Sequence, residues 1–383
     1  MEENIYFKRD ILEIKDIEEE NLYQEHILKY INDLVLYSLK NGGSDIHFES
    51  REKDLRVRVR IDGTLKEFQV FNKSFGIKIL SKIKILTELD IGEKRLPQDG
   101  RFKGKYGEEE IDFRVSFIPT IFGEKCVVRI LINNASKLDL NTLGFNNQNL
   151  KTIYEAIERK SGLLLFCGPT GSGKTTTLYS IINYLNKEEV NIVTIEDPIE
   201  YQLLGINQIQ CKSEIGLNFS TILRSVLRQD PDIILIGEIR DFETAEIALM
   251  ASLTGHLVLS TLHTKDSISA IDRLVGFGID KYTIASGLSL VQSQRLVRKI
   301  CKICFGKDIN CEKCNDGFKG REAVEEIIFF NEEIRKILIE ENSSKKLKEY
   351  LKKNNFKSIL ENGKEKITKK ITTEKEIIKE CSI

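Results

Sequence analysis

The sequence lacks a charge excess of either sign, a long apolar run and any internal repeat. Its 383 residues contain 58 Lys and Arg against 59 Asp and Glu, which gives a formal net charge of −1. This neutral total does not resemble a basic nucleic-acid-binding protein, although it leaves room for a local patch. No stretch approaches the roughly 18–20 apolar residues that span a bilayer, and the N-terminus has no apolar core of a secretory signal. We therefore expect a cytoplasmic protein whose membrane contact is peripheral.

The first third of the chain predicts a small α+β domain. Helical apolar spacing covers residues 26–40, and two glycines end it. Strict alternation over residues 55–61 predicts a half-buried strand, and Asp62-Gly63 supplies a tight hairpin turn into the next one. A helix at 74–89 and two further strands complete this part. The boundaries that we expect are an N-terminal arm and helix at 1–40, the α+β domain at 41–133 and a polar linker at 134–150.

From residue 151 the pattern changes to short apolar runs separated by segments of helix length. Such alternation predicts a parallel sheet covered by helices, the arrangement of an α/β domain. After Cys314 the chain becomes rich in Lys and Glu with apolar residues at helical spacing, which predicts a helical tail. The corresponding boundaries are an α/β domain at 151–300, a cysteine-rich element at 301–320 and a helical C-terminal region at 321–383.

A phosphate-binding loop is the strongest motif in the sequence. Residues 168–175 match G-x-x-x-x-G-K-[ST] at every fixed position, after an apolar strand and before a helical segment. Its glycines let backbone N–H groups approach phosphate oxygens, Lys174 is placed to neutralise the β- and γ-phosphates, and Thr175 to reach Mg²⁺. The alternative is a glycine-rich turn that arose by chance. The expected nucleotide-binding residues are Gly168, Pro169, Thr170, Gly171, Ser172, Gly173, Lys174, Thr175 and Thr176.

Two acidic residues follow predicted strands at the edge where ligands collect in parallel sheets. Glu196 follows the run at 192–195, and Glu238 follows Gly237, one residue later than the acid of a common Walker B strand. Both are candidates for holding Mg²⁺ or orienting the attacking water, while the plainer alternative is a helix cap or a solvated turn. His256 and His263 bracket the next strand. They are candidate phosphate sensors or, equally, hydrogen-bonded structural histidines.

Four of the eight cysteines form two C-x-x-C pairs within 14 residues. Four soft thiolates at this spacing satisfy a tetrahedral Zn²⁺ site without an open position, so we expect structural zinc. The six residues between the pairs are fewer than the roughly 15–20 of many zinc ribbons. A redox dithiol or two unrelated pairs are the alternatives. The expected ligands are Cys301, Cys304, Cys311 and Cys314.

The order of these motifs resembles the ATPase family of type II secretion and type IV pilus assembly. Walker A is followed by TIEDPIEY, by ILIGEIRDFETA with its atypical Gly-Glu pair, and by TGHLVLSTLHT, which resemble the aspartate box, Walker B and histidine box of that family. Further similarity lies in SDIHFE, RVRIDG and LPQDGR of the first domain and in the late KGR. The resemblance covers about residue 30 to the end of the chain.

The resemblance implies a ring, usually a homohexamer, of RecA-like P-loop domains, each with a smaller N-terminal α+β (PAS-like) domain. In that family, arginines of the smaller domain complete the nucleotide site of a neighbour, and the matching positions are Arg101, Arg114 and Arg129. By spacing alone these are exposed strand arginines. The implied catalytic set is Lys174, Glu196, Glu238, His256, His263 and the three arginines, with ATP, Mg²⁺ and Zn²⁺ as cofactors.

The function that we expect is an ATP-hydrolysing motor that powers assembly of a type IV or competence pilus, or of a type II secretion pseudopilus. Its partner would be an inner-membrane platform protein. A pilus-retraction ATPase is the first alternative, and the family's retraction branch typically lacks the four cysteines. A nucleic-acid-translocating ATPase is the second, but the neutral charge and the lack of a basic aromatic stripe weigh against nucleic acid as a partner.

Overall fold

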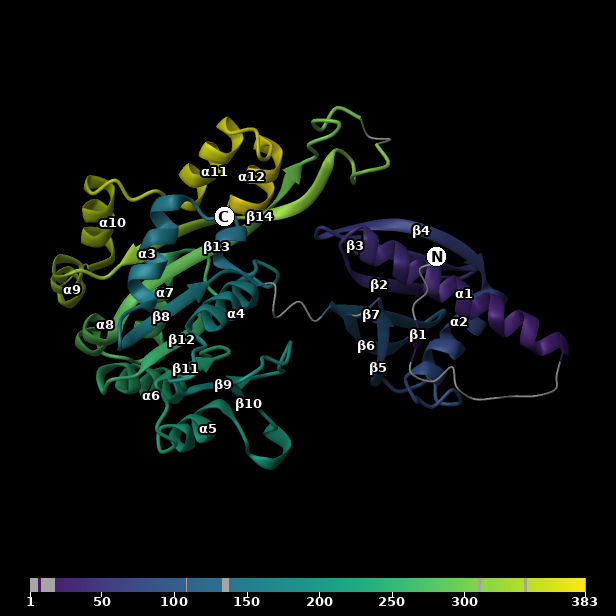
Figure 1. The fold of residues 1–383 in the computed structure, drawn as a ribbon, viewed down its shortest axis with the longest axis horizontal. Helices are drawn as coiled ribbons and strands as arrows, with labels where there is room; N and C mark the ends of the chain where they lie inside the picture. Colours follow the sequence, from purple (N-terminus) through teal and green to yellow (C-terminus); the bar gives the residue numbers. More distant parts are fainter. Residues whose placement is uncertain are drawn as a thin grey trace. The chain divides into compact units, whose positions relative to one another are not determined.

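The chain separates into two compact units in the computed structural model (Figure 1). One unit comprises Met1–Asn133 with Lys307–Gly320, and the other comprises Asn134–Gly306 with Arg321–Ile383. Residues 6–7, 18–107, 109–132, 138–308, 311–340 and 343–382 are described. Much of the expected N-terminal arm before residue 18, and the first part of the expected linker, lie outside the described residues.

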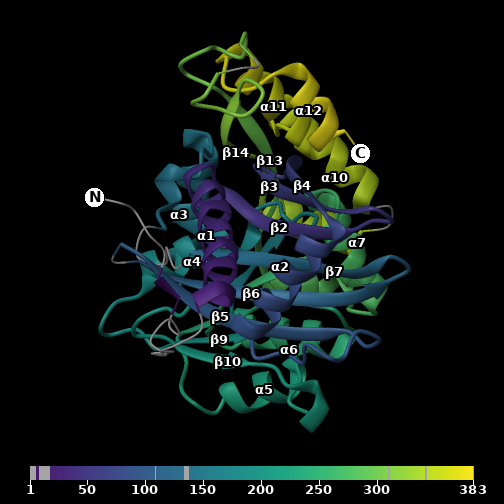
Figure 2. The same cartoon turned by 90° about the vertical axis from the view of Figure 1, so that its right-hand side faces the viewer.

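The N-terminal unit is built on a seven-stranded sheet with the order β1-β5-β6-β7-β2-β3-β4. Its apolar face is covered by two helices, which is visible in Figure 2. The helices are α1 (Glu18–Lys40) and α2 (Lys73–Leu86). The strands are β1 (Tyr6–Phe7), β2 (Gly43–Ser50), β3 (Asp54–Ile61), β4 (Thr64–Asn72), β5 (Gln98–Tyr106), β6 (Glu109–Thr120) and β7 (Gly123–Ile132).

The hairpin predicted at Asp62-Gly63 is confirmed. Both residues have positive φ, 48° and 83°, and they connect β3 directly to β4. A two-residue turn of this kind matches the twist of the strands on either side and therefore fixes their register. The apolar residues of β3 are buried and its arginines face the other way, as the alternation predicts.

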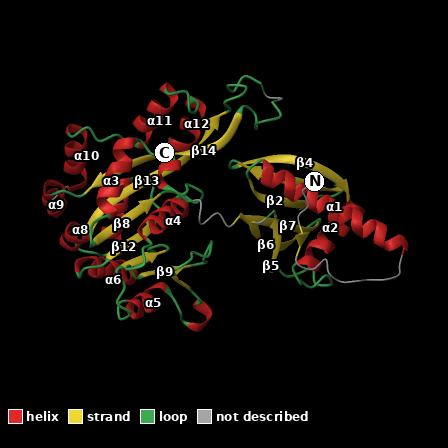
Figure 3. Ribbon diagram, viewed as in Figure 1, coloured by secondary structure: helices red, strands yellow, loops and turns green. Residues whose placement is uncertain are grey.

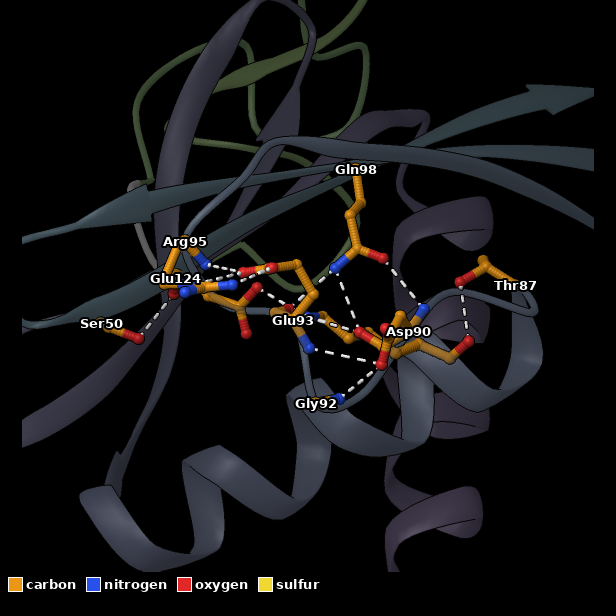
Figure 4. Close-up of polar contacts among 9 residues, drawn as sticks. Ser50, Thr87, Asp90, Gly92, Glu93, Arg95, Gln98 and Glu124 are labelled. Carbon is orange, nitrogen blue, oxygen red and sulfur yellow. Dashed lines mark hydrogen bonds and ion pairs between the residues drawn. The ribbon is translucent and has the colours of Figure 1, made fainter.

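Polar contacts around Asp90, Glu93 and Gln98 hold the irregular segment between α2 and β5 (Figure 4), and a buried lysine takes part in them. Lys84 is 1% exposed, and its ammonium donates to the backbone carbonyls of Asp90 (3.1 Å) and Glu93 (2.7 Å) while lying 2.7 Å from a carboxylate oxygen of Glu124. The side chain of Gln98 donates to the same two carbonyls. A buried charge is tolerated only when it is paired and hydrogen-bonded, and this one meets both conditions.

The second unit has a seven-stranded sheet with the order β10-β9-β11-β12-β8-β13-β14, in which all neighbouring strands from β10 across to β13 pair in parallel. The α/β architecture predicted from the alternating runs is confirmed. The strands are β8 (Gly162–Cys167), β9 (Ile192–Glu196), β10 (Asn207–Gln210), β11 (Ile233–Ile236), β12 (Leu257–Leu262), β13 (Leu288–Ile300) and β14 (Phe318–Phe329).

Helices cover both faces of this second sheet (Figure 3). Alternate residues of β8 enter two different cores: Leu163 and Leu165 pack with α5 to α8, and Leu164 packs with α3 and α4. Because both faces are buried, the strands read as continuous apolar runs rather than as alternating ones. The helices are α3 (Asn147–Ile157), α4 (Lys174–Leu185), α5 (Phe219–Val226), α6 (Phe242–Leu253), α7 (Ser267–Phe277) and α8 (Lys281–Gly287).

The helical tail expected after Cys314 begins later than the sequence indicates, because β14 comes first. Its Glu325 and Glu326 suggest a solvated helix, yet both are buried, at 0% and 5% exposure. Backbone N–H groups of Asn146 (3.0 Å) and Ser267 (2.8 Å) donate to them. Distant parts of the chain thus supply the donors that a local pattern cannot reveal. Helices come after this strand as α9 (Glu332–Ile339), α10 (Ser343–Lys353), α11 (Ile359–Thr368) and α12 (Glu374–Cys381).

Within the described part of the chain, none of the helices combines the length and the apolar character needed to cross a membrane.

Candidate nucleotide-binding site

The glycine-rich loop connects the buried strand β8 to the first turn of α4, as the motif requires. Gly168, Gly171 and Gly173 all have positive φ, at 146°, 80° and 88°. The first residue of α4 is Lys174, so the helix N-terminus opens onto the loop. Helix N-termini favour anions through their free N–H groups and their dipole.

A side chain that the sequence did not reveal supports this loop from behind. Gln294 of β13 donates to the Ser172 carbonyl (2.7 Å) and accepts from the Thr177 hydroxyl (3.0 Å). A Cβ at Gly168 would lie 2.6 Å from the Gln294 carbonyl oxygen and from the Ser172 hydroxyl, so only glycine fits there. Among the described residues, the buried Ser172 Oγ has no hydrogen-bond partner.

Lys174 is buried within the loop that it follows. It is 8% exposed, and its ammonium donates to the carbonyls of Gly168 (2.8 Å) and Pro169 (3.0 Å). Burial lowers the pKa of Lys174 to about 8, against the opposing effect of nearby Cys167 and Glu238. A desolvated ammonium beside a helix N-terminus suits the neutralisation of phosphate charge. Thr175, the expected magnesium ligand, is exposed next to it, and Thr176 is half-buried.

We predict that this depressed pKa makes nucleotide binding sensitive to pH. Bound phosphates favour the charged ammonium and raise the pKa of Lys174 above about 8, so binding at higher pH takes up a proton. Affinity for ADP should therefore fall by up to about tenfold per pH unit above pH 8 and stay level near pH 7. Calorimetry in buffers of different ionisation enthalpy measures the number of protons taken up when ADP binds. Equal affinity at pH 7 and pH 9 would contradict the prediction.

Glu238 and His263 meet at the carboxyl ends of β11 and β12. The His263 Nε2 lies 3.4 Å from a Glu238 carboxylate oxygen, and Arg240 donates to the other oxygen at 2.5 Å. Burial works against ionisation, but Arg240, His263 and Lys174 together hold the pKa of Glu238 below its usual value. Burial and Lys174 lower the pKa of His263, so near neutral pH this imidazole is uncharged. The Glu238 carboxylate is therefore ionised, and it lies at the same edge of the sheet as the phosphate-binding loop.

Gly237, at the position of the usual Walker B acid, lies close to the end of the neighbouring strand β9. A Cβ at Gly237 would lie 3.2 Å from the Ile195 carbonyl oxygen, because the Gly237 N–H donates to that carbonyl at 2.7 Å. A side chain at position 237 would therefore be crowded, whereas Glu238 carries its carboxylate one residue further on.

Glu196 ends β9, but its carboxylate is held by neighbouring side chains. The hydroxyls of Tyr179 and Thr194 donate to it, the latter at 2.6 Å, and so does the Gln208 amide at 3.2 Å. The residue is 4% exposed. Burial beside this carboxylate raises the pKa of Tyr179, so the phenol stays protonated and remains a donor. These three donors leave one acceptor position of the carboxylate, on the oxygen that accepts from Tyr179, for water or Mg²⁺.

His256 lies at the other end of β12, away from the phosphate loop. Its Nδ1 is 3.0 Å from the Ala251 carbonyl and 3.4 Å from the Thr254 hydroxyl, at the end of α6. The two histidines are thus not brought together, and the geometry of His256 favours the structural alternative. His263 alone joins the cluster around Glu238.

The three expected arginines form one cross-strand row in the N-terminal unit. Arg101 is opposite Arg114, and Arg114 is opposite Arg129, on the adjacent strands β5, β6 and β7. They line a hollow of about 570 Å³. Asp45 of β2, which belongs to the SDIHFE motif but was given no role from the sequence, is 7% exposed and accepts from the Arg129 Nε at 2.9 Å. This carboxylate orients one guanidinium of the row.

The four cysteine side chains of the expected zinc element converge. The Sγ atoms of Cys301, Cys304, Cys311 and Cys314 all lie within 4.8 Å of one another. Tetrahedral zinc with Zn–S bonds of about 2.3 Å requires sulfurs roughly 4 Å apart, so the group fits with a small contraction. The Ile303 N–H also donates to the Cys301 sulfur (3.4 Å), which supports a thiolate there.

These features are those of a P-loop ATPase of the RecA-like type, with a second, smaller domain. Residues 20–379 match the family described as "Type II/IV secretion system protein", and the chain belongs to that family.

Two curated relatives illustrate the family. The chain is 44% identical over 380 residues to the type IV pilus assembly ATPase PilB of Myxococcus xanthus, covering 92% of this chain and 67% of the relative. It is 43% identical over 360 residues to the type II secretion system protein HxcR of Pseudomonas aeruginosa, covering 92% and 77%. The chain thus spans about two thirds of the length of the pilus assembly ATPase.

A solved structure supports the same fold. The pilus retraction motor PilT with bound ADP superimposes with a TM-score of 0.65 at 28% identity, covering 91% of this chain and 95% of that one. The assembly and secretion relatives are therefore more similar in sequence to this chain than this retraction motor is.

Proposed function

We propose that this protein binds ATP at the loop 168–175, hydrolyses it, and uses the energy to power assembly of a type IV or competence pilus or of a secretion pseudopilus. The observation that carries the proposal is the meeting of Lys174, Glu238 and His263 at the carboxyl ends of β8, β11 and β12. This edge is where ligands bind in parallel sheets, and a cation next to an ionised acid suits phosphoryl transfer.

Each residue of the cluster has a proposed role. Lys174 neutralises the β- and γ-phosphates, and Thr175 places its hydroxyl on Mg²⁺. Glu238 holds Mg²⁺ or its water, and His263 links the γ-phosphate to that carboxylate, since it lies 3.4 Å from it. Glu196 orients the attacking water through the acceptor position that its three present donors leave.

The arginine row is proposed to act on a second copy of the chain. Arg101, Arg114 and Arg129 present three cations around a hollow, which suits the charge that develops on a transferred phosphoryl group. In a ring, usually a hexamer in this family, each smaller domain then supplies these arginines to a neighbour. Asp45 keeps Arg129 pointed at the hollow.

The proposed place of action is the inner face of the cell membrane, against a platform protein of the pilus or secretion machine. The relatives named as pilus assembly and secretion proteins support this site of action. They also favour assembly over retraction, since the retraction motor is less similar.

Phosphate release by the purified protein tests this proposal. We expect Mg²⁺-dependent hydrolysis of ATP that rises more than linearly with protein concentration, because sites form only between copies. No hydrolysis and no nucleotide binding at millimolar ATP would overturn it.

We also predict one zinc ion per chain, held by the four cysteines. Protein purified without added metal should contain it by elemental analysis, and a Cys311→Ser/Cys314→Ser variant should lose it, because two thiolates do not complete a tetrahedral site. Cys381→Ser is the matched control, since Cys381 is buried in a separate apolar cluster with Val297 and Val324, and its replacement should leave the zinc content unchanged. Zinc-free protein with all four thiols titrating freely would contradict the prediction.

A further inference from the structure

A second polar cavity lies at the amino-terminal end of β8, the end opposite the phosphate loop. Its volume is about 390 Å³, within the range of small-molecule sites. β8 has six residues, which places this end roughly 20 Å from Gly168. The cavity is therefore separate from the nucleotide site. It is lined by cations and hydroxyls, among them Arg159, Lys160, Arg335, Ser252, Ser286 and Ser289.

The positive charge of this cavity is not balanced by carboxylates. None of its lining residues is acidic, and among the described residues none lies within ion-pair distance of Arg159, Lys160 or Arg335. Arg335 donates instead to two backbone carbonyls at the end of α8, those of Ala285 and Ser286. The Arg159 guanidinium lies over the Phe329 ring, 4.4 Å from its centroid. Neither contact supplies a full negative charge.

The two arginines also repel each other. Burial and the charge of Arg159 both lower the pKa of Arg335. Like charges brought together on converging chain segments are unfavourable unless an anion joins them. The carbonyl dipoles at the end of α8 stabilise Arg335 and the Phe329 ring stabilises Arg159, but neither contact supplies a counter-charge for the exposed cations Arg159 and Lys160.

A buried hydroxyl completes the lining. Ser289, at the start of β13, is 4% exposed. A Cβ on Gly162 would lie 2.2 Å from its Oγ, and Gly162 has a φ of 130°. A glycine at this position therefore makes room for the hydroxyl at the base of the cavity.

We propose that this cavity binds a phosphate-bearing small anion. Guanidinium groups pair with phosphate through two parallel hydrogen bonds, and lysine and serine supply further donors. The phosphate can belong to a soluble phosphate ester or to a phospholipid headgroup. Neither source involves the phosphate loop, so the proposal does not depend on ATP hydrolysis.

Calorimetry with inorganic pyrophosphate, in a Lys174→Ala background that weakens the nucleotide site, tests the proposal. We expect a binding event whose affinity falls about tenfold or more in Arg159→Gln/Lys160→Gln, because two charged donors are lost. Lys151→Gln is the matched control: Lys151 lies on α3, and its side chain is 72% exposed and pairs with Glu155. This control should bind pyrophosphate with the same affinity as Lys174→Ala alone.

Vesicle sedimentation distinguishes the two sources. Binding to phosphatidic acid vesicles but not to phosphatidylcholine vesicles, lost in the double variant, assigns the site to a lipid headgroup. Pyrophosphate binding without vesicle binding assigns it to a soluble ester. If neither probe binds, or if the double variant binds both as the control does while its melting temperature falls, the cations only stabilise helix ends and the proposal is overturned.

Discussion

Replacing Lys174 with alanine should abolish ATP hydrolysis while leaving the fold intact. The ammonium is the cation at the start of α4 that lies within the loop, and without it the β- and γ-phosphates are left to backbone N–H groups. We expect turnover to fall by roughly 10³-fold or more, which corresponds to about 4 kcal/mol of transition-state stabilisation.

The stability of this variant should change little. Lys174 carries a desolvated charge, as its lowered pKa shows, so its removal relieves the cost of burial while losing two hydrogen bonds to Gly168 and Pro169. A melting temperature within a few degrees of that of the unchanged protein would show that the variant has lost activity but not its fold. Lys187→Ala, on the exposed segment after the same helix, is the control and should keep full activity. Unchanged turnover in Lys174→Ala would contradict the assignment of the loop at 168–175 as the nucleotide-binding site.

Arg114→Ala should be equally inactive alone, yet regain activity when mixed with Lys174→Ala. The first variant keeps an intact loop, and the second keeps an intact arginine row, so a site between one copy of each has both parts. With random mixing at equal amounts, about a quarter of the sites in a ring are complete. The loss in the single variant should be about 10³-fold, the effect of an arginine that acts in trans.

Phosphate release across a mixing series measures this complementation. Activity should peak near equal amounts and disappear at either end. Arg51→Ala is the control, because Arg51 pairs with Asp54 on another part of the same sheet and should leave turnover unchanged. Full activity of Arg114→Ala, or mixtures no more active than their components, would show that the row serves no neighbouring site.

Features of this fold that depend on residues close to one another in the sequence are predictable from the sequence. The α/β alternation, the strand at 55–61 and the turn at Asp62-Gly63 all lie where the local pattern indicates. The phosphate-binding loop is predictable for the same reason, because the buried strand before it and the helix after it are adjacent in the sequence.

Features that depend on contacts between distant residues are not predictable in this way. Gln294 supports the phosphate loop from β13, and no local pattern marks it. The glutamates of β14 suggest a solvated helix, and only their remote N–H donors make burial in a strand possible. The separation of His256 from His263 is a consequence of strand length, since β12 lies between them.

The contacts of Lys84 restrict the length of the connection between α2 and β5. Between Thr87 and Pro97 the backbone forms no helix or strand, and one ammonium with one glutamine side chain satisfies carbonyls that a regular element would otherwise pair. The length of this connection is therefore set by the reach of a single side chain. An inserted or deleted residue would move these carbonyls away from the buried ammonium and leave it with Glu124 as its remaining described partner. We therefore expect relatives to differ here by substitution rather than by length.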